Sequence, residues 1–264
     1  MTSHDNGSID SFDVAAANKE LLQESLDEAL EQTQTLDGIL DDIEAGRKFS
    51  GDLVFAISGL TRLLSKISTT DGYQSLGIIG HRLDDYFSAL KDLSAKVMAD
   101  LRKFVEVLED LLDNPSSIST DASEIVRSLP AKGGFDGNDI EVRSIEVLLV
   151  MLPGTATRYV ERELQQCGYR VSLVSNVFDA LPTIVRTKPD LVVISGVMQE
   201  LNGIDLAIGL SSMPATRNVP IALITALGDE DGYLSLLPEN VPVIHKGASF
   251  ADDLFKALDD MFLI

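Results

Sequence analysis

The sequence predicts an α+β multidomain protein, with a four-helix bundle in its N-terminal half and a doubly wound α/β domain in its C-terminal half. In the first half, apolar residues recur every three or four positions, which is the spacing of helices that each bury one stripe. The second half has short apolar runs between helical stretches, a pattern typical of a parallel sheet with helical crossovers. A segment rich in Ser, Asp, Gly and Pro separates the two halves and indicates a linker.

Four largely apolar series define the bundle. Each series places one stripe along a helix, so the stripes can be buried only against one another. Turn residues at 46–51 and 69–72 separate the first three series, and Asn114-Pro115 stops the fourth. The join near Lys91 has a weaker signal, and one long bent helix is the alternative there. The series are Leu22, Leu26, Ala29, Thr33, Leu36, Leu40, Ile43; Leu53, Ile57, Leu60, Leu64, Ile67; Leu76, Ile79, Leu83, Tyr86, Leu90; and Leu93, Val97, Leu101, Phe104, Leu108, Leu111.

These patterns divide the chain into four parts. Residues 1–12 are predicted to be a disordered tail, because they are polar and contain Ser, Asp and Gly. Residues 13–114 form the bundle, residues 115–143 the linker and residues 144–264 the α/β domain. A short helix around residues 121–129 is a further expectation within the linker.

The α/β domain is predicted to hold a five-stranded parallel sheet, because strands buried on both faces read as continuous apolar runs. The helical stretch near 229–237 is the poorest of the five. The strands are expected at Val147–Met151, Val171–Val174, Leu191–Ile194, Ile221–Ile224 and Val241–Ile244, and the helices at Thr155–Gln166, Asn176–Arg186, Ile204–Met213, Asp229–Leu237 and Phe250–Phe262.

Composition excludes several functions. The formal charge of −21 repels nucleic acid and anionic lipid, so we expect no nucleic-acid partner. Such acidity is typical of a solvated surface, or alternatively of a face that docks a basic partner. One cysteine, Cys167, excludes an internal disulfide, and no apolar run reaches about 20 residues or follows a basic start. We therefore expect a cytoplasmic protein without membrane insertion.

The sequence contains no recognisable catalytic or metal-binding motif. One cysteine and three scattered histidines do not make the clustered spacings of zinc sites, and neither a Walker loop nor a nucleophile elbow is present. We therefore expect no metal, no cofactor and no enzymatic activity.

Five phrases in the C-terminal half resemble, in order and spacing, the strands and loops of the CheY-like receiver domain of bacterial two-component signalling. The resemblance covers nearly all of residues 144–264 and implies the flavodoxin-like fold. The phrases are EVLLVMLPG (146–154), CGYRVSLVSN (167–176), PDLVVISGVMQELNG (189–203), VPIALITA (219–226) and VPVIHKG (241–247).

The resemblance also implies that receiver chemistry is lost. Receivers carry an aspartate that accepts a phosphoryl group at the end of the third strand, and an acidic pair that holds magnesium after the first strand. Ser195 stands at the first position, and Met151 and Leu152 stand at the pair. Magnesium needs oxygen ligands, which Met and Leu do not offer, and a serine without a metal or base is a poor nucleophile. We predict a pseudo-receiver that is not phosphorylated.

Two receiver positions keep their residue types. Thr225 falls at the switch hydroxyl and Lys246 at the lysine that grips the phosphoryl group, but neither suffices alone. In the ordinary interpretation, Thr225 ends a buried strand and Lys246 is an exposed or locally paired cation. Val243 and Gly247 depart from the aromatic and proline residues that receivers often carry there, which also indicates that the switch is lost.

The bundle resembles a histidine phosphotransfer (HPt) domain over residues 54–90 (VFAISGLTRLLSKISTTDGYQSLGIIGHRLDDYFSAL). The alignment places Ser58 at the phosphorylated histidine, Thr61 at a lysine and Arg62 at a glycine, so the resemblance implies a degenerate site. Ser58 lies beside the apolar stripe and is expected to be exposed. That fits a vestigial site and equally an ordinary surface serine.

His81 is the only histidine of the bundle and lies off the apolar stripe, so we expect it to be exposed. One hypothesis makes it a displaced phosphoacceptor, with Asp84 or Asp85 orienting the ring. The other makes it a solvated histidine on a helix.

These features favour a non-catalytic two-component signalling adaptor that binds a histidine kinase, a response regulator or another regulatory protein. A phosphorelay intermediate using His81 is the alternative, and a structural protein whose bundle forms a homodimer is the second alternative. The expected binding surfaces are the exposed side of the second and third helices around Ser58, Arg62, His81 and Asp84, and the face of the α/β domain formed by its fourth helix, fifth strand and fifth helix.

Overall fold

The computed structural model describes residues 11–47, 50–88, 90, 92–114, 122–131, 144–228, 230–247 and 249–261. The chain divides into two compact units, which are described separately: a helical unit, Met1–Asp84 with Lys91–Ser119, and an α/β unit, Asp85–Leu90 with Thr120–Ile264. Of the expected tail and linker, residues 1–10, 115–121 and 132–143 lie outside the described residues.

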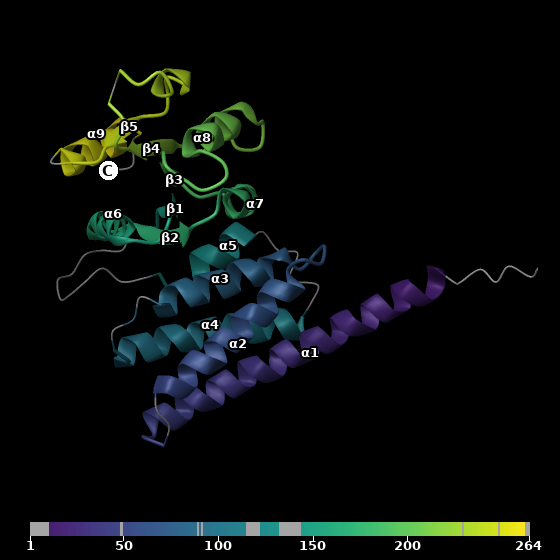
Figure 1. Cartoon of the computed structure of the whole chain (residues 1–264). Helices are drawn as coiled ribbons and strands as arrows, with labels where there is room; N and C mark the ends of the chain where they lie inside the picture. Colours follow the sequence, from purple (N-terminus) through teal and green to yellow (C-terminus); the bar gives the residue numbers. More distant parts are fainter. Residues whose placement is uncertain are drawn as a thin grey trace, which may run out of the picture. The chain divides into compact units, whose positions relative to one another are not determined.

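The helical unit is built from helices (Figure 1), and apolar residues of each helix are buried. The long α1 packs against both α2 and α4. The third and fourth apolar series form separate helices, because α3 ends at Ser88 and the hydroxyl of Ser94 caps α4 by accepting from the N–H of Val97 at 3.4 Å. The helices are α1 (Ser11–Glu44), α2 (Ser50–Ile67), α3 (Gln74–Ser88) and α4 (Ala95–Asp113).

One ion-pair cluster joins α4 to the end of α1. The guanidinium of Arg102 donates to Asp37 at 2.9 Å, to Asp41 at 2.6 Å and to Glu44 at 2.9 Å. These carboxylates raise the pKa of Arg102, mainly through the hydrogen bonds to Asp41 and Glu44. Several charges that share one partner stabilise a fold more than an isolated surface pair does.

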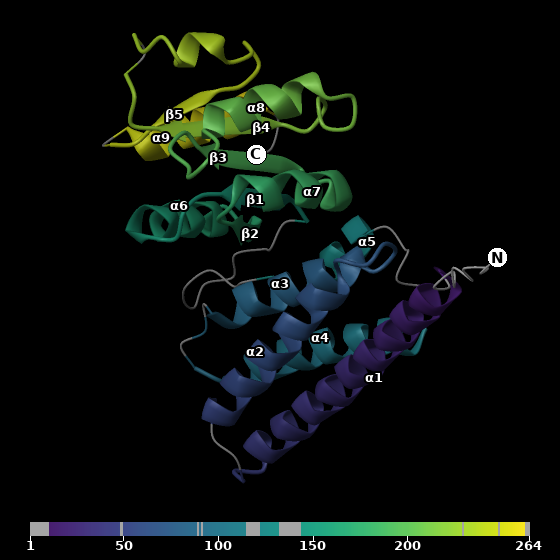
Figure 2. The same cartoon turned by 45° about the vertical axis from the view of Figure 1, so that its right-hand side comes forward.

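The α/β unit contains a five-stranded parallel sheet in the order β2-β1-β3-β4-β5 (Figure 2). This is the 2-1-3-4-5 order of the flavodoxin-like doubly wound fold, so the predicted fold class is confirmed. The strands are β1 (Glu146–Val150), β2 (Arg170–Val174), β3 (Leu191–Ser195), β4 (Ile221–Thr225) and β5 (Val243–His245), and the helices around them are α6 (Thr155–Gln166), α7 (Val177–Thr187), α8 (Gly203–Ser212) and α9 (Phe250–Asp260).

Helices cover both faces of the sheet, so the strands β1, β3 and β4 are buried along their whole length. Successive residues of each strand alternate between the two cores. Leu149 and Val193 pack in the core beneath α6 and α9, whereas Leu148 and Val192 pack in the core beneath α7 and α8.

The prediction of a helix at residues 229–237 is wrong. Among the described residues of this segment, only a 3-10 turn forms, η2 (Leu234–Leu236). Gly232 and Pro238 leave too few residues for a helix, and the carboxylate of Asp231 accepts from the N–H of Tyr233 at 2.9 Å, which favours a turn. As far as residues 230–237 are described, the binding face expected from the fourth helix, fifth strand and fifth helix of this domain therefore lacks its fourth helix.

The fifth strand begins two residues later than predicted, at Val243 rather than Val241. Pro242 has no N–H to donate to a neighbouring strand, although its carbonyl still accepts from the N–H of Leu223 at 2.9 Å.

A short helix, α5 (Ala122–Ser128), forms within the segment expected to be a linker, close to the predicted 121–129. It belongs to the α/β unit and contacts α7.

Candidate functional site

The predicted receiver-type residues lie at the carboxyl edge of the sheet, where α/β folds place their sites. Ser195 ends β3, Thr225 ends β4 and Lys246 follows β5. The register pairs Ser195 with Ile224 and Thr225 with His245. In addition, the N–H of Lys246 donates to the carbonyl of Thr225 at 2.8 Å. The topology therefore brings the backbones of these residues together along one edge.

Ser195 is almost fully buried, at 3% exposure. Its hydroxyl donates to the carbonyl oxygen of Val197 at 3.2 Å, within the loop that follows β3. That loop returns to the sheet, because the N–H of Gly203 donates to the carbonyl of Gly196 at 3.2 Å. The hydroxyl therefore has a structural role in the loop.

Thr225 is buried, and its hydroxyl accepts from the N–H of Leu227 at 3.0 Å. A Cβ placed on Gly196 would lie 3.2 Å from this hydroxyl oxygen, so the β3 and β4 loops pack closely. Lys246 is exposed. These positions agree with the ordinary interpretation of both residues, while their functional roles stay predictions.

Met151 and Leu152, the residues predicted to stand at the acidic pair of receivers, have apolar side chains. Met151 is buried in the core beneath α6 and α9, and Leu152 is half-buried. The carbonyl of Leu152 accepts from the hydroxyl of Thr157 in the first turn of α6. Within the described ranges, no cluster of three or more His, Cys, Asp or Glu residues is placed to hold a metal ion.

A small cavity of about 220 Å³ lies beside this edge, between α6 and the start of α9. The rings of Tyr159 and Phe250 lie 5.3 Å apart with an interplanar angle of 59°, and the guanidinium of Arg162 is 5.4 Å from the Tyr159 ring centre. The cavity is apolar apart from a lysine at its lining, and its residues are Ala156, Tyr159, Val160, Lys246, Gly247 and Phe250.

In the helical unit, Ser58 and Arg62 of α2 are exposed, as is His81 of α3. The exposure of Ser58 and His81 is as predicted, while their roles stay predictions. Thr61 is half-buried and donates to the carbonyl of Ser58 at 3.4 Å. α2 and α3 approach closely here, because a Cβ on Gly80 would lie 3.6 Å from the carbonyl oxygen of Thr61.

The two acids proposed to orient His81 differ in their surroundings. Asp84 is exposed, whereas Asp85 is buried, at 9% exposure. Arg82, which lies between His81 and these two acids in the sequence, is also buried, at 4% exposure. Asp84 is therefore the more accessible of the two acids.

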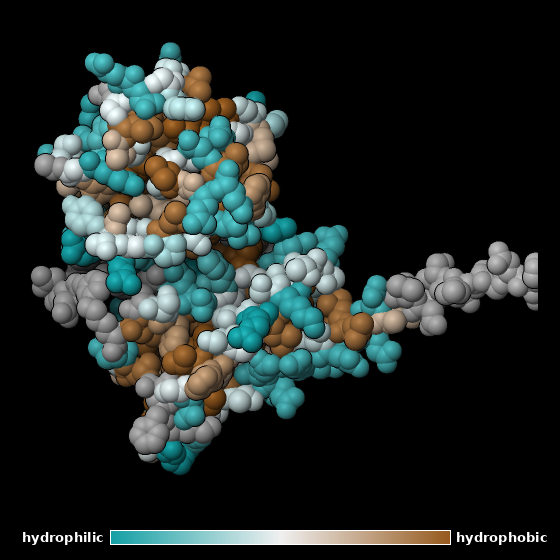
Figure 3. All heavy atoms as spheres, in the orientation of Figure 1, coloured by the Kyte–Doolittle hydropathy of each residue, from teal (hydrophilic) through white to brown (hydrophobic). Residues whose placement is uncertain are grey.

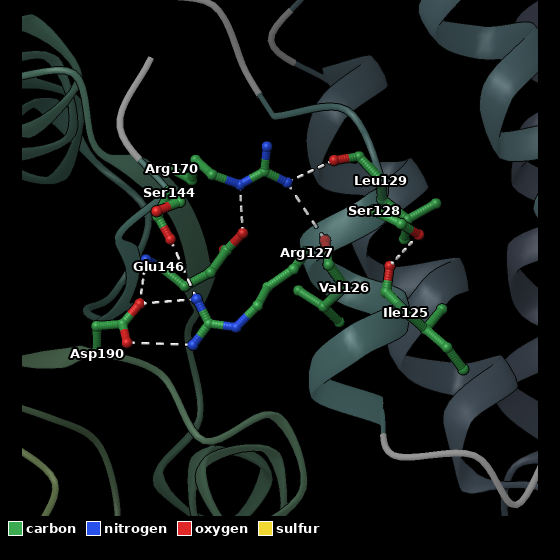
Figure 4. Close-up of polar contacts among 9 residues, drawn as sticks. All are labelled: Ile125, Val126, Arg127, Ser128, Leu129, Ser144, Glu146, Arg170 and Asp190. Atoms are coloured by element: carbon green, nitrogen blue, oxygen red, sulfur yellow. Dashed lines mark hydrogen bonds and ion pairs between the residues drawn. The ribbon is translucent and has the colours of Figure 1, made fainter.

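A second polar cluster lies at the amino edge of the sheet, opposite the predicted receiver-type residues (Figure 4). The sequence patterns did not predict it. It joins Arg127 of α5 and Arg170 of β2 to Glu146 and Asp190. Arg127 and Asp190 are 63 positions apart, so no local spacing connects them.

Strand order and the two covered faces define the α/β unit as a domain of the flavodoxin-like fold. No protein-family model matches the chain.

The chain is similar to response regulators in sequence. It is 31% identical over 120 residues to response regulator PleD of Caulobacter vibrioides, which covers 46% of this chain and 24% of PleD. It is 35% identical over 71 residues to the phosphate regulon transcriptional regulatory protein PhoB of Pseudomonas aeruginosa, which covers 27% of this chain and 31% of PhoB. The chain thus spans less than a third of either relative.

Among solved structures, the receiver domain of sensor histidine kinase PA1611 from Pseudomonas aeruginosa PAO1, which holds a magnesium ion in its active-site cleft, is 23% identical. The match covers 45% of this chain and 98% of that domain, with a TM-score of 0.39. The sequence similarity to response regulators relates the α/β unit to receiver domains and supports a connection with two-component signalling.

No helix among the described residues has both the length and the apolar character needed to cross a membrane.

Proposed function

We propose that this protein is a non-catalytic two-component signalling adaptor, which binds a histidine kinase, a response regulator or another regulatory protein without phosphorylation of its own receiver-like domain. The carboxyl edge of the sheet carries the proposal. Met151 and Ser195 are both buried, and the resemblance to receivers aligns them with positions that need carboxylates. Without those oxygens, a divalent cation has poor ligands and the charge of a transferring phosphoryl group is not neutralised.

Large apolar side chains are exposed on the α/β unit, where a partner could contact them. In the view of Figure 3, hydrophobic residues interrupt the hydrophilic surface of this unit. Exposed apolar surface is common on proteins and marks a partner site only where it is contiguous. The exposed large apolar residues of this unit include Phe178, Val185, Val197, Tyr233, Leu236 and Phe255.

The cavity beside Lys246 supports a protein ligand in particular. Its volume of about 220 Å³ is below the range of about 300–1,000 Å³ that is typical of small-molecule sites. It suits a single apolar side chain of a partner, and Lys246 at its lining favours an acidic neighbour next to that side chain.

Intact mass spectrometry after incubation with acetyl phosphate and magnesium tests the missing chemistry. We expect no added phosphate on the wild-type protein. The matched variant Met151→Asp/Leu152→Asp/Ser195→Asp restores the carboxylates, and we expect it to bind magnesium more tightly than the wild type. A phosphate on wild-type Ser195 would overturn the proposal.

Affinity capture from the source cell, followed by binding measurements with the purified partner, tests the adaptor role. We expect Lys246→Ala and Tyr159→Ala to weaken binding to a kinase or regulator, and Lys96→Ala, an exposed change on α4, to leave it unchanged. A protein that binds no two-component partner would contradict the role.

A phosphorelay role for His81 is the second candidate, because His81 and Asp84 are both exposed on α3. In that reaction a histidine ring nitrogen would attack the phosphorus of a phosphoaspartate, and the aspartate would leave as a carboxylate. Incubation of wild type and His81→Ala with phosphorylated receivers, followed by detection of acid-labile phosphate, separates the two roles. Label on the wild type alone favours the relay, and its absence from both removes it.

The structural role, in which the bundle forms a homodimer, is tested by light scattering on the whole chain. A monomer at micromolar concentration argues against it.

A further inference from the structure

The first helix, α1, is much longer than the helices that pack against it. It has 34 residues, whereas α2 has 18 and α4 has 19. Because a helix rises by about 1.5 Å per residue, α1 extends past the ends of both partners, as Figure 1 shows. Burial agrees with this, because the first buried residue among the described side chains of α1 is Leu26. Residues 16–25 are called the free end of α1 below.

The sequence explains why the free end is helical although little of it is buried. Residues 15–32 contain no Gly, no Pro and no β-branched residue, and their Ala, Leu, Glu and Gln residues favour helices. The free end also continues into the packed part of α1, so it needs no nucleus of its own. The side-chain amide of Gln23 donates to Asp27 at 2.9 Å, and that of Gln32 donates to Glu28 at 3.1 Å. The free end is therefore a preformed helical surface.

Two leucines lie within the polar surface of the free end. Leu21 is 60% exposed and Leu22 is half-buried. Leu22 precedes Leu26 by four positions and Ala29 by seven, so the three residues share one stripe of the helix. Leu26 and Ala29 are buried. The buried stripe of α1 thus continues into an apolar surface that the helical unit covers only in part.

The free end and the turns that follow it are strongly acidic. Residues 16–32 contain one cation, Lys19, and five carboxylates. Glu24 and Glu28, both exposed, follow Leu21 by three and seven positions, on the same side of the helix. The amides that bond Asp27 and Glu28 are neutral, so they do not compensate these charges. The five acids are Glu20, Glu24, Asp27, Glu28 and Glu31.

We propose that the free end of α1 docks a basic amphipathic helix of a partner protein. Apolar side chains of that helix cover Leu21 and Leu22, and its Lys or Arg side chains lie against Glu24 and Glu28. A second copy of α1 is a poor occupant, because it would place carboxylates beside carboxylates. This surface belongs to the helical unit, and the proposal does not depend on the adaptor function.

Binding of two designed peptides to the full-length protein tests the charge of the occupant. Both peptides are about 18 residues long, roughly five helical turns, with leucines every three or four positions. One carries Lys at the remaining positions and the other carries Glu. We expect calorimetry to show micromolar binding of the Leu/Lys peptide that weakens as salt screens the charges, and at least tenfold weaker binding of the Leu/Glu peptide. Equal affinities would refute the proposal.

Exposed substitutions test the surface itself. We expect Leu21→Gln to weaken binding of the Leu/Lys peptide at least fivefold. Leu236→Gln is the matched control, because Leu236 is also 60% exposed but belongs to the α/β unit. Its affinity should equal that of the wild type, and an equal loss in both variants would contradict docking on α1.

A second pair of variants separates local charge from total charge. We expect Glu24→Gln/Glu28→Gln to weaken binding of the Leu/Lys peptide at least fivefold. Asp259→Asn/Asp260→Asn removes the same number of exposed charges from α9 and should leave binding unchanged. Equal losses would show that the peptide responds only to the net charge of the chain, and the proposal would fail.

Hydrogen exchange and sedimentation identify the place and the occupant. We expect the bound Leu/Lys peptide to slow exchange in residues 16–25 at least fivefold and to leave α9 unchanged, whereas protection in α9 alone would place the peptide elsewhere and end the proposal. In sedimentation, wild type and Leu21→Gln should have the same mass at micromolar concentration. A wild-type dimer that Leu21→Gln dissociates would make a second copy the occupant instead of a basic partner.

Discussion

Gly203 lies directly against the carbonyl group of Ser195. A Cβ on Gly203 would be 1.9 Å from that carbonyl oxygen and 2.9 Å from the carbonyl carbon. Gly203 is the first residue of α8, and the side chain of Asn202 caps the helix by accepting from the N–H of Ile204 at 3.0 Å. The β3–α8 connection is therefore closed by a backbone contact that only glycine allows, whatever residue stands at position 195.

We expect Gly203→Ala to lower the free energy of unfolding of the α/β unit by about 1–3 kcal/mol, because the methyl group forces backbone to move. Gly209→Ala in the same helix is the control. No atom lies within 4 Å of its added Cβ, so we expect a gain of about 0.5–1 kcal/mol from helix propensity. Denaturant titration, followed by hydrogen exchange in β3 and β4, measures both. Equal effects would contradict the close contact.

Arg102→Met should lower the stability of the helical unit by about 1 kcal/mol, because it leaves three carboxylates without their shared partner. The loss should shrink at high salt, which screens exposed charges. Lys103→Met removes a single exposed pair with Glu106, at 2.9 Å, and should cost less than about 0.5 kcal/mol. Hydrogen exchange in α1 and α4 at low and high salt distinguishes the variants, and a loss independent of salt would point to packing instead.

Glu109 of α4 should make the stability of the helical unit depend on pH. Burial raises its pKa above the ordinary value of 4.5, and the charges of Asp37 and Asp113 raise it further. Because the folded-state pKa is the higher one, the protonated carboxyl stabilises the fold. This contribution is complete below the unfolded pKa and is lost as the pH rises through the folded pKa.

Glu109→Gln should therefore stabilise the helical unit at pH 7, by about 0.5 kcal/mol or less after allowance for solvent screening. The gain should vanish in acid, where wild-type Glu109 is protonated. Urea titrations from acid to neutral pH measure it, with Asp110→Asn, an exposed change in the same helix, as the control. A gain that persists at low pH would contradict the electrostatic cause.

Phe250→Ala should destabilise the α/β unit by about 3–5 kcal/mol, because Phe250 is 3% exposed and packs in the core beneath α6 and α9. Phe255→Ala in the same helix is the control, since its side chain is 51% exposed and the change should stay within about 0.5 kcal/mol. Thermal unfolding followed by circular dichroism compares them. Similar losses would mean that the ring of Phe250 is not a core residue.

The sheet could be predicted from sequence because burial on both faces imposes continuous apolar runs, such as Leu191–Ser195. The end of α4 followed from a local signal, Asn114-Pro115, because the helix ends at Asp113 with Asn114 as its C-cap. The helix expected near residue 233 failed because its apolar spacing is short and Gly232 interrupts it.

The candidate sites were harder to predict from the sequence than the sheet and the helices. Ser195 and Thr225 could be aligned because each ends a strand, and parallel pairing then places them at one edge. The pairing of Arg127 with Asp190 could not be predicted, because it depends on how α5 meets the start of β1. Neither spacing nor composition reports contacts that only the tertiary fold creates.

The short fifth strand has a consequence for self-association. β5 closes one side of the sheet with only Val243–His245, and Pro242 before it lacks a donor. A foreign strand would find few groups to pair with there, so edge-to-edge addition and cross-β growth are disfavoured. The most aggregation-prone segments, such as Leu191–Ser195, lie inside the sheet with a neighbour on each side. At the β5 edge of the folded domain, amyloid-like addition of a strand is therefore disfavoured.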